Sequence, residues 1–365
     1  MGNALGVRKR LHFYSLRFYS LFRITKLNSN IRNLTHTRFQ GENMIRKRYP
    51  FLAGLLLSVA ALGAQADSYP SRPIKVVSPF PAGGATDVLT RVLAERMAKT
   101  LGQPMIVENK AGAGTSIGAA FVARETPDGY TILMATNSTL VTNRYLYKEL
   151  PYDPDGFAPI GMVGVGPLVL LSSPKRPFNS TADVVAYAKQ NPGKLTFATF
   201  GAGTSSHLAG ELFKERAGID ILHVPFKGAT QALPALISGD VDLFFDMVAT
   251  GMPQAEAGKV KVFAITSPNR LATESKLPTL AEQGYAGFDM TAWFSFVAPK
   301  GTPAPVLEKL QAALADTLKD EAVKKRMLEM GIDPRSGSPS ELARQIRNEQ
   351  PIVSQLIKQA NIVLQ

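Results

Sequence analysis

Residues 74–87 combine, in immediate succession, a short apolar strand, a turn rich in proline and glycine, and the start of a helix at Thr86 and Asp87. Glycines such as Gly83 and Gly84 allow backbone amides to approach a ligand closely. The helix start adds unpaired N–H groups at the positive end of the helix dipole. Because the turn contains no Lys or Arg, we expect it to hold a carboxylate rather than a polyphosphate.

The same arrangement recurs farther along the chain. There, Gly201 and Gly203 lie in the turn, Thr204 and Ser205 offer hydroxyl groups, and His207 lies in the first helical turn. The helix dipole favours the neutral form of a histidine at that position. Two such units, one in each half of the chain, predict a clamshell that closes on a small anion.

Strands and amphipathic helices alternate along the chain, which predicts a mostly parallel sheet. Two apolar segments are expected to cross between lobes, and a lobe interrupted by another is the plan of a hinged binding protein. The crossing segments are residues 160–172 and 291–299. The expected strands are 74–78, 105–108, 130–135, 195–199, 221–225, 241–245 and 260–266. The expected helices are 88–101, one beginning near 116, 181–190, 206–217, 229–238, 305–319, 321–331 and 340–359, the last opened by a Ser-Glu cap.

An export signal is expected at residues 44–66. A basic start is followed by the apolar run 51–62 and by a small-x-small cleavage signal at 64–66, which would leave Asp67 as the mature N-terminus. The apolar run is too short for a permanent membrane anchor. No Cys follows it, which argues against a lipoprotein form. These features predict export by a cleaved signal peptide, to a periplasm.

Residues 1–43 have no place in that signal. They are basic and contain scattered aromatic residues. Three explanations stay open: a start codon assigned too early, which we favour, a genuine extension of the basic region, and an organellar type of presequence. We expect no fold of this stretch.

The high net charge of the chain belongs to this leader. Of 41 Lys and Arg and 29 Asp and Glu, residues 1–66 hold 11 basic residues and one acidic residue, which leaves 30 and 28. The mature part is therefore nearly neutral and gives no indication of nucleic acid or a membrane surface as partner. The absence of Cys excludes disulfides, a thiolate nucleophile and a zinc–thiolate site.

Two catalytic or nucleotide-binding interpretations are weak. The small-residue loop 111–118 matches neither GxGxxG nor GK[ST], so we expect no nucleotide and no cofactor. Ser205 and His207 could form a hydrolase pair, but both lie at a helix start and the GxSxG elbow is absent. His207 could equally fix the loop as a structural residue.

Four further residues have a structural and a functional interpretation. Asp242 and Asp246 flank an apolar strand, where pinning a neighbouring loop is favoured over a metal or acid–base role. Lys227 is either a solvated surface charge or a source of positive potential in the cleft. Trp293 is expected to pack in the hinge or the core.

Several motifs, taken together and in this order, resemble the Bug-type periplasmic solute receptors of the tripartite tricarboxylate transporter family. The resemblance covers residues 69–365. The motifs are PFPAGGATD at 79–87, VENKAGAG at 107–114, PDGYT at 127–131, LPYD at 150–153, GTSSHLAGELF at 203–213, HVPFKG at 223–228, AWF at 292–294 and APKGTP at 298–303.

The resemblance implies an α/β, type II periplasmic-binding-protein fold, in which two α/β lobes are joined by two crossing segments with a ligand cleft between them. Lobe 1 would comprise residues 67–165 and 293–365, and lobe 2 residues 166–292. The expected partners are a small carboxylic-acid solute and the integral membrane permease subunits of a tripartite tricarboxylate transporter. The receptor itself is expected to be a monomer.

In such receptors the loops matching residues 80–85 and 201–206 grip one carboxylate, partly through ordered waters, while variable residues meet the rest of the ligand. Two departures from the family pattern are Met247, which could make the distal pocket more apolar, and Arg144. Asp87 is expected to cap its helix and order the loop. The candidate ligand-binding residues are Phe80, Pro81, Ala82, Gly83, Gly84, Ala85, Asp87, Thr136, Asn137, Ser138, Gly201, Gly203, Thr204, Ser205, His207 and Asp246.

A solute receptor, not an enzyme, is the function that we expect. A periplasmic sensor that signals to a membrane protein would share the same pocket and differ only downstream. A secreted hydrolase using Ser205 and His207 would instead show turnover that is lost when either residue is changed.

Overall fold

The computed structural model describes residues 69–360 and residue 362. The expected signal peptide and the stretch that precedes it lie outside these residues. Within the described part of the chain, no helix is both long and apolar enough to cross a membrane.

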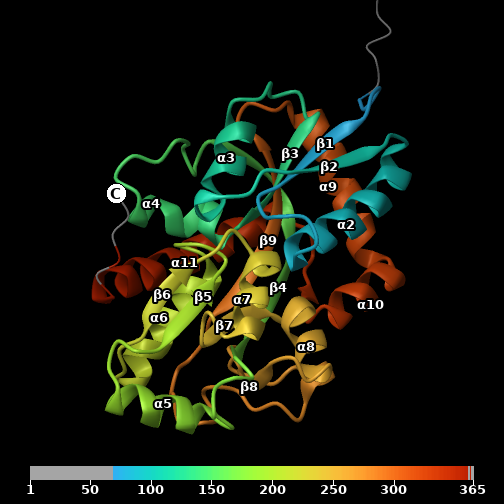
Figure 1. The fold of residues 1–365 in the computed structure, drawn as a ribbon. Coiled ribbons are helices and arrows are strands. Elements are labelled where there is room, and N and C mark those ends of the chain that lie inside the picture. Colours follow the sequence, from blue (N-terminus) through green and yellow to red (C-terminus); the bar gives the residue numbers. More distant parts are fainter. Residues whose placement is uncertain (1–68, 361, 363–365) are drawn as a thin grey trace, which may run out of the picture. The chain divides into compact units, whose positions relative to one another are not determined.

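A continuous mixed sheet runs through the described residues in the order β2-β1-β3-β9-β4-β7-β5-β6, and β8 and β10 also pair with β4 (Figure 1). The strands are β1 (Ile74–Ser78), β2 (Met105–Asn109), β3 (Thr131–Thr136), β4 (Phe157–Ser172), β5 (Thr196–Thr199), β6 (Leu222–Pro225), β7 (Leu243–Met247), β8 (Lys261–Ile265), β9 (Thr291–Pro299) and β10 (Asp333–Pro334).

The sheet has two halves that share the strand β4. Residues 157–167 of β4 pair with β9, ending at the partners Pro167 and Thr291, and from Leu168 onward β4 pairs with β7 and β8. We call β2, β1, β3, β9, β10 and the first part of β4 the first half-sheet. The second half-sheet contains the rest of β4 with β7, β8, β5 and β6.

The expectation of a mostly parallel sheet is wrong: among the described strands, parallel pairing is confined to the neighbours of β1 and of β5. β1 pairs in parallel with β2 and β3, and β5 pairs in parallel with β6 and β7. All pairings of the crossing strands β4 and β9 are antiparallel. Parallel neighbours need long crossover connections, which here are helices, whereas β4 and β9 run in opposite directions because one leaves the first half-sheet and the other returns.

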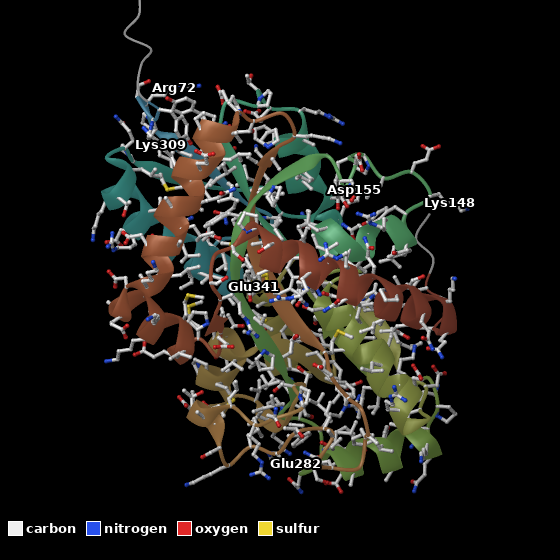
Figure 2. All side chains as sticks on the ribbon, turned by 180° about the vertical axis from the view of Figure 1, so that it is seen from behind. Arg72, Lys148, Asp155, Glu282, Lys309 and Glu341 are labelled. Atoms are coloured by element: carbon white, nitrogen blue, oxygen red, sulfur yellow. The ribbon has the colours of Figure 1, made fainter. Side chains whose placement is uncertain are left out.

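Helices cover both half-sheets (Figure 1). α11 packs against β4, and Figure 2 shows it crossing the long central strands when the protein is seen from behind. The α-helices are α2 (Ala85–Leu101), α3 (Ser116–Ala123), α4 (Asn143–Leu146), α5 (Thr181–Gln190), α6 (Ser205–Ala217), α7 (Ala229–Ser238), α8 (Val248–Glu256), α9 (Ala304–Lys319), α10 (Glu321–Glu329) and α11 (Pro339–Gln359). Shorter helical segments are η1 (Ala113–Thr115), η2 (Ser138–Thr142) and η3 (Ala272–Glu274).

Most expected elements form within a few residues of their expected bounds, and the differences have local causes. α2 begins at Ala85, before Thr86 and Asp87. α11 begins at Pro339, and its N-cap is Ser338, whose side chain accepts a hydrogen bond from the N–H of Glu341. The helical segments η2, α4 and α8 were not expected, since η2 and α4 are only five and four residues long and α8 contains Pro253.

Trp293 packs in the core, as expected. It is fully buried in β9, opposite Val165 of β4, and its indole N–H donates a hydrogen bond to the Glu349 carboxylate of α11. The indole therefore ties the last helix to the crossing strand.

Asp242, which directly precedes β7, pins the start of β5, the structural role favoured for it. Its carboxylate accepts hydrogen bonds from the N–H of Thr196 at 2.7 Å, from the hydroxyl of Thr196 at 3.0 Å and from the guanidinium of Arg176. Only 2% of Asp242 is exposed. The carboxylate thus holds three donors at the base of the second half-sheet.

We predict that Asp242→Ala lowers the free energy of unfolding by roughly 1–3 kcal/mol, because it leaves the half-buried Thr196 N–H without an acceptor. Urea unfolding at neutral pH measures this. Asp240→Ala, at an exposed neighbouring position, is the matched control and should change the unfolding midpoint little. Equal effects of the two substitutions would contradict the pinning role.

Candidate functional site

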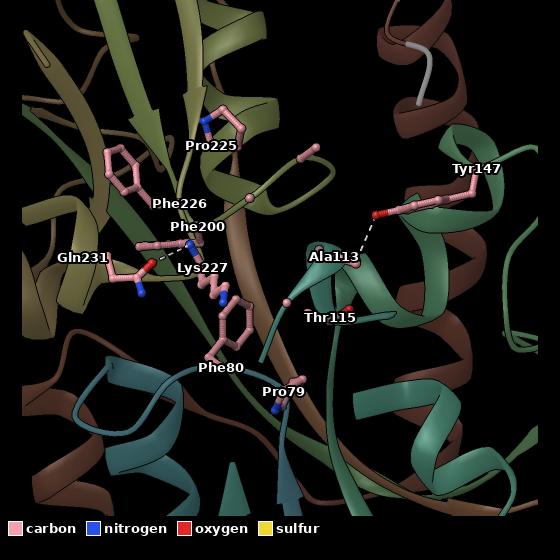
Figure 3. Close-up of a pocket in the computed structure, with 14 residues that line it drawn as sticks. Pro79, Phe80, Ala113, Thr115, Tyr147, Phe200, Pro225, Phe226, Lys227 and Gln231 are labelled. Carbon is pink, nitrogen blue, oxygen red and sulfur yellow. Dashed lines mark hydrogen bonds between the residues drawn. The ribbon is translucent and has the colours of Figure 1, made fainter. Parts of the chain in front are cut away.

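A cavity of about 540 Å³ lies between loops of the two half-sheets (Figure 3). Lys227 is the only charged residue in its lining. The first half-sheet contributes Pro79, Phe80, Gly112, Ala113, Gly114, Thr115 and Tyr147, and the second contributes Phe200, Gly201, Ala202, Pro225, Phe226, Lys227 and Gln231. A cavity with this lining is able to attract an anion and contains no carboxylate that would repel one.

The loops from the two half-sheets touch each other across the cavity. The rings of Phe80 and Phe200 meet edge to face with centroids 6.3 Å apart. A Cβ on Gly114 would come within 2.3 Å of the carbonyl oxygen of Ala202, so only glycine fits there. The two halves are therefore in direct contact along this line.

The loop that leads into α2 is ordered by Asp87. The Asp87 carboxylate accepts hydrogen bonds from the N–H of Gly83 at 2.9 Å, from the Asn109 amide at 2.8 Å and from the Arg91 guanidinium at 3.0 Å. Burial alone would raise the pKa of Asp87, but these hydrogen bonds outweigh it and lower the pKa. Asp87 has the ordering role that we expected, and it uses the N–H of Gly83.

Further amides remain at this helix start. The first helical hydrogen bond runs from the N–H of Val88 to the carbonyl oxygen of Gly84. The N–H groups of the first turn, from Ala85 to Asp87, therefore have no acceptor within the helix. They are the donors that α2 offers to an anion.

The loop that leads into α6 is held by its own side chains. Gly201 and Gly203 have φ values of +120° and +78°, which favour glycine. The hydroxyl of Thr204 donates to the carbonyl oxygen of Gly201 at 2.7 Å. The N–H of Gly203 donates to Nδ1 of His207 at 3.2 Å.

His207 and His223 are stacked beneath this loop and are both neutral. Their ring centroids are 3.9 Å apart, and the rings are inclined by 18°. Burial, together with the neighbouring His223 and Lys214, lowers the pKa of His207 to about 3, and burial with Lys214 lowers the pKa of His223 to about 4.

The geometry gives no support to a hydrolase pair. Nδ1 of His207 is occupied by the Gly203 N–H, and its Nε2 lies 3.7 Å from Oε1 of Glu211. Neither nitrogen is hydrogen-bonded to Ser205, and the neighbouring hydroxyl of Ser206 donates to the carbonyl oxygen of Phe245. A general base must reach the proton that it removes. His207 therefore acts as a structural residue of the loop.

Buried polar side chains lie behind the cavity. Thr136 ends β3, Asn137 and Ser138 follow it, and each is at most 3% exposed. Asn137 donates to Glu349 at 3.3 Å. The buried oxygens that have no hydrogen-bond partner in the described residues are Oγ of Ser78, Oγ1 of Thr136, Thr142 and Thr317, Oδ1 of Asn143, Oγ1 of Thr181 and Oδ2 of Asp246. Unpartnered buried oxygens are costly, so a polar ligand would relieve some of them.

Asp246 lies at the end of β7 and is fully buried. Its Oδ1 accepts from the N–H of Met247 and the hydroxyl of Thr250, both at 2.8 Å. Burial raises its pKa to about 7 despite these hydrogen bonds. Asp246 is not part of the cavity lining.

The two residues that depart from the family pattern also lie away from the cavity lining. The Met247 methyl group is directed toward Gly166 of β4, where it would be 3.2 Å from an added Cβ. Arg144 forms two hydrogen bonds with Asp155, at 2.9 and 3.2 Å, and donates to the carbonyl oxygen of Leu140. Neither residue supports the expectation of a more apolar distal pocket.

The structure thus brings together part of the expected site and adds residues that were not expected. Phe80 and Gly201 line the cavity. The loop 112–115, which the sequence indicated only as a failed nucleotide motif, faces Gly201 and Ala202. Tyr147 donates its hydroxyl to the carbonyl oxygen of Ala113 at 2.9 Å and so holds this loop (Figure 3). The glycines at 112 and 114, which both adopt positive φ, are the sequence signal that could have revealed it.

No group of three or more His, Asp or Glu side chains is placed to bind a metal ion in the part of the chain that the structure describes.

Comparison with known proteins places the chain among solute-binding proteins. The family model described as tripartite tricarboxylate transporter family receptor matches residues 89–362. The structure of the periplasmic binding protein BugD shares 39% sequence identity, with a TM-score of 0.78, and the match covers 81% of this chain and 100% of that one.

Two similar structures carry a ligand in their descriptions. Rpa4515 of R. palustris, with adipate, is 34% identical with a TM-score of 0.78 over 81% of this chain and 99% of that one. MatC of Rhodopseudomonas palustris, with bound malate, is 33% identical with a TM-score of 0.75 over 79% of this chain and 100% of that one.

The raised pKa of Asp246 predicts a pH-dependent stability. Between its ordinary value of 3.8 and about 7 the folded protein binds the proton more tightly than the unfolded chain, so this carboxyl stabilises the fold at low pH. Its contribution is lost as the pH rises through that window.

We therefore expect Asp246→Asn to gain stability relative to the native chain, by on the order of a few kcal/mol, as the pH rises from about 4 to about 8. Urea unfolding of both proteins at several pH values measures this difference. The exposed Asp240→Asn is the control. A difference that stays constant with pH would show that Asp246 does not titrate in this window.

Proposed function

This chain belongs to the tripartite tricarboxylate transporter receptor family, and from that premise we propose that its solute is a small carboxylic acid, captured between the two half-sheets. It is a solute-binding protein of a periplasmic family and not an enzyme. One observation carries the choice of ligand: the loops that lead into α2 and α6 meet at a cavity whose only charged lining residue is Lys227.

The chemistry of these loops suits a carboxylate. Amides at the start of a helix bind an anion through N–H groups and through the positive end of the dipole. The carboxylates that are close to the loops are engaged elsewhere, as Asp87 is with Gly83, Asn109 and Arg91. The relatives described with adipate and malate support the same class of ligand.

We propose the following roles for the candidate residues. Residues 80–85 and 201–205 form the two faces that grip the carboxylate. Thr136, Asn137 and Ser138 lie where the rest of the solute would extend. Asp87, His207 and Asp246 do not touch the solute but hold the backbone around it, because their polar atoms bond to the loops or to the end of β7.

The division into lobes follows from the same premise. We propose that residues 67–165 with 293–365 form one lobe, that residues 166–292 form the other, and that they rotate about β4 and β9. The change of partner strand between Pro167 and Leu168 supports a hinge there. Delivery to integral permease subunits, by a monomer exported through a cleaved signal peptide at 44–66, completes the proposed role.

The first test is thermal unfolding of residues 67–365 with carboxylic acids, after unfolding and refolding to remove bound solute. The panel spans malate, adipate, citrate, acidic amino acids and aromatic acids, with phosphate and neutral sugars as controls. A ligand at 100 times its Kd should stabilise by about 2.7 kcal/mol and shift the midpoint by several degrees.

A shift confined to carboxylates would support the proposal. A shift by phosphate or sugar alone would contradict the ligand class. If none of the carboxylates shifts the midpoint, a role in sensing or in protein interaction becomes the better interpretation.

Closure can be tested at Gly228, which meets the opposite half at Pro81. Gly228 has an extended backbone with φ of 170°, which any residue can adopt. An added Cβ would lie 2.7 Å from Cδ of Pro81. Gly228→Ala should therefore hinder closure without straining its own loop.

We expect Gly228→Ala to raise the Kd of the carboxylate found in the screen about tenfold or more. This corresponds to a loss of roughly 1.4 kcal/mol of binding free energy. Titration calorimetry measures the affinity, and small-angle scattering measures whether the liganded protein stays more open. Pro81→Ala removes the opposing ring carbon, so the double variant should recover affinity. A double variant that binds no better than Gly228→Ala would contradict a steric block.

A further inference from the structure

His207 and His223 are the only histidines in the described residues, and their stacked rings lie directly behind the Gly201–Gly203 turn. Phe197 stacks on both rings, with centroids 6.4 Å from His207 and 5.2 Å from His223. The three rings form a rigid support between β5, β6 and α6.

Each histidine bonds to a different end of the turn. Nδ1 of His207 accepts from the N–H of Gly203 at 3.2 Å. Nε2 of His223 lies 2.7 Å from Oγ1 of Thr199, and that same hydroxyl oxygen accepts from the N–H of Gly201 at 3.1 Å. The turn is thus held at Gly201 through Thr199 and at Gly203 directly.

These partners fix the tautomers. Because Nδ1 of His207 accepts a hydrogen bond, its proton must be on Nε2, which faces Glu211. The hydroxyl of Thr199 is buried, and the acceptor within its reach is Nε2 of His223. His223 therefore carries its proton on Nδ1, and the two rings are opposite tautomers.

We propose that His207 and His223 are positioning residues for ligand capture: as opposite neutral tautomers, they hold the Gly201–Gly203 turn in the conformation that binds the solute. This rests on the proposed function for its consequence but not for its geometry. Protonation of Nδ1 of His207 would direct an N–H at the N–H of Gly203 and release that end of the turn. A second charge on the stacked partner would repel the first.

The charged groups around the rings are few. Glu211 faces Nε2 of His207 at 3.7 Å, and Lys214 pairs with Glu211 at 3.0 Å. The charge of Asp220 also acts on Glu211 and raises its pKa. Burial raises the pKa of Glu211 despite Lys214, and the low pKa values of both histidines keep the rings neutral above about pH 5.

The geometry is tested without any ligand. Nitrogen-15 NMR of the native mature chain reports the protonated ring nitrogen of each histidine. We expect Nε2–H for His207 and Nδ1–H for His223, together with slow hydrogen exchange at the N–H of Gly203. Two rings of the same tautomer would overturn the proposal, whether or not a carboxylate binds.

The consequence for capture is tested with paired substitutions. His207→Phe keeps a stacked ring but has no acceptor, whereas His207→Asn places an oxygen near the position of Nδ1. His223→Phe and His223→Gln form the equivalent pair for Nε2. The probes are malate and adipate, and titration calorimetry measures their affinity.

We expect the two Phe variants to bind at least about tenfold more weakly, and the Asn and Gln variants to recover most of that loss. The Phe variants should lose less free energy of unfolding than free energy of binding, because the stack of rings remains. Phe variants with native affinity would overturn the positioning role while the proposed function stands.

The pH dependence separates positioning from a merely structural role. The affinity of the native chain should fall more steeply between about pH 5 and pH 3 than that of the double variant His207→Asn with His223→Gln, which lacks both titrating rings. Titration of the ligand itself affects both proteins equally. Superimposable pH profiles would overturn the proposal. If neither probe binds, the proposed ligands are wrong. Hydrogen exchange at the Gly203 N–H then tests the positioning role: faster exchange in His207→Phe than in His207→Asn supports it, and equal exchange overturns it.

Discussion

The antiparallel pairing of β4 with β9 is the contact on which the rest of this structure depends. β4 belongs to both half-sheets, so one strand is hydrogen-bonded to β9 in the first half and to β7 in the second. Among the described residues, the chain itself crosses between the halves only in β4 and β9. Gly164 brings the β4 backbone against the end of α10, since an added Cβ would lie within 3 Å of Ile332 and Met327. The crossing strands are therefore packed on one side by the C-terminal helices, while their backbone can bend where β4 changes its partner from β9 to β7.

This arrangement explains why the loops of the two halves meet. In each half, parallel strands direct their carboxyl ends toward the region between the halves, which is where ligands bind in open α/β sheets. The turns after β1, β5 and β6 all contribute to the cavity lining. Two units that are similar in sequence, each a strand, a glycine turn and a helix, come face to face because the sheet continues through β4.

Local sequence signals predicted these units, but not the residues that contact them from the other half. The strand β1 and the helices α5 and α7 follow from their apolar spacing and their flanking Gly or Ser residues. The segment η2 does not, because its buried polar residues are held by distant partners, such as Thr139 by Thr115. The approach of Gly114 to Ala202 is likewise a property of the tertiary structure. The sequence could therefore indicate the loops 80–85 and 201–206 and the glycines of the loop 112–115, whereas the contact of that loop with Ala202 and the role of Tyr147 required the fold.

The charges near the cavity show how such a site can bind an anion and still release it. Asp87 and Asp246 each accept hydrogen bonds from the backbone near a helix start, so their carboxyl groups order the backbone there and do not line the cavity. The lining contains no guanidinium, and Lys227 is exposed. A bidentate arginine pair would hold a carboxylate tightly in either arrangement of the lobes. Helix amides contributed by both halves act together only when the halves are closed. In the function that we propose, affinity is thereby coupled to closure, and opening of the proposed hinge would by itself weaken the hold on the solute.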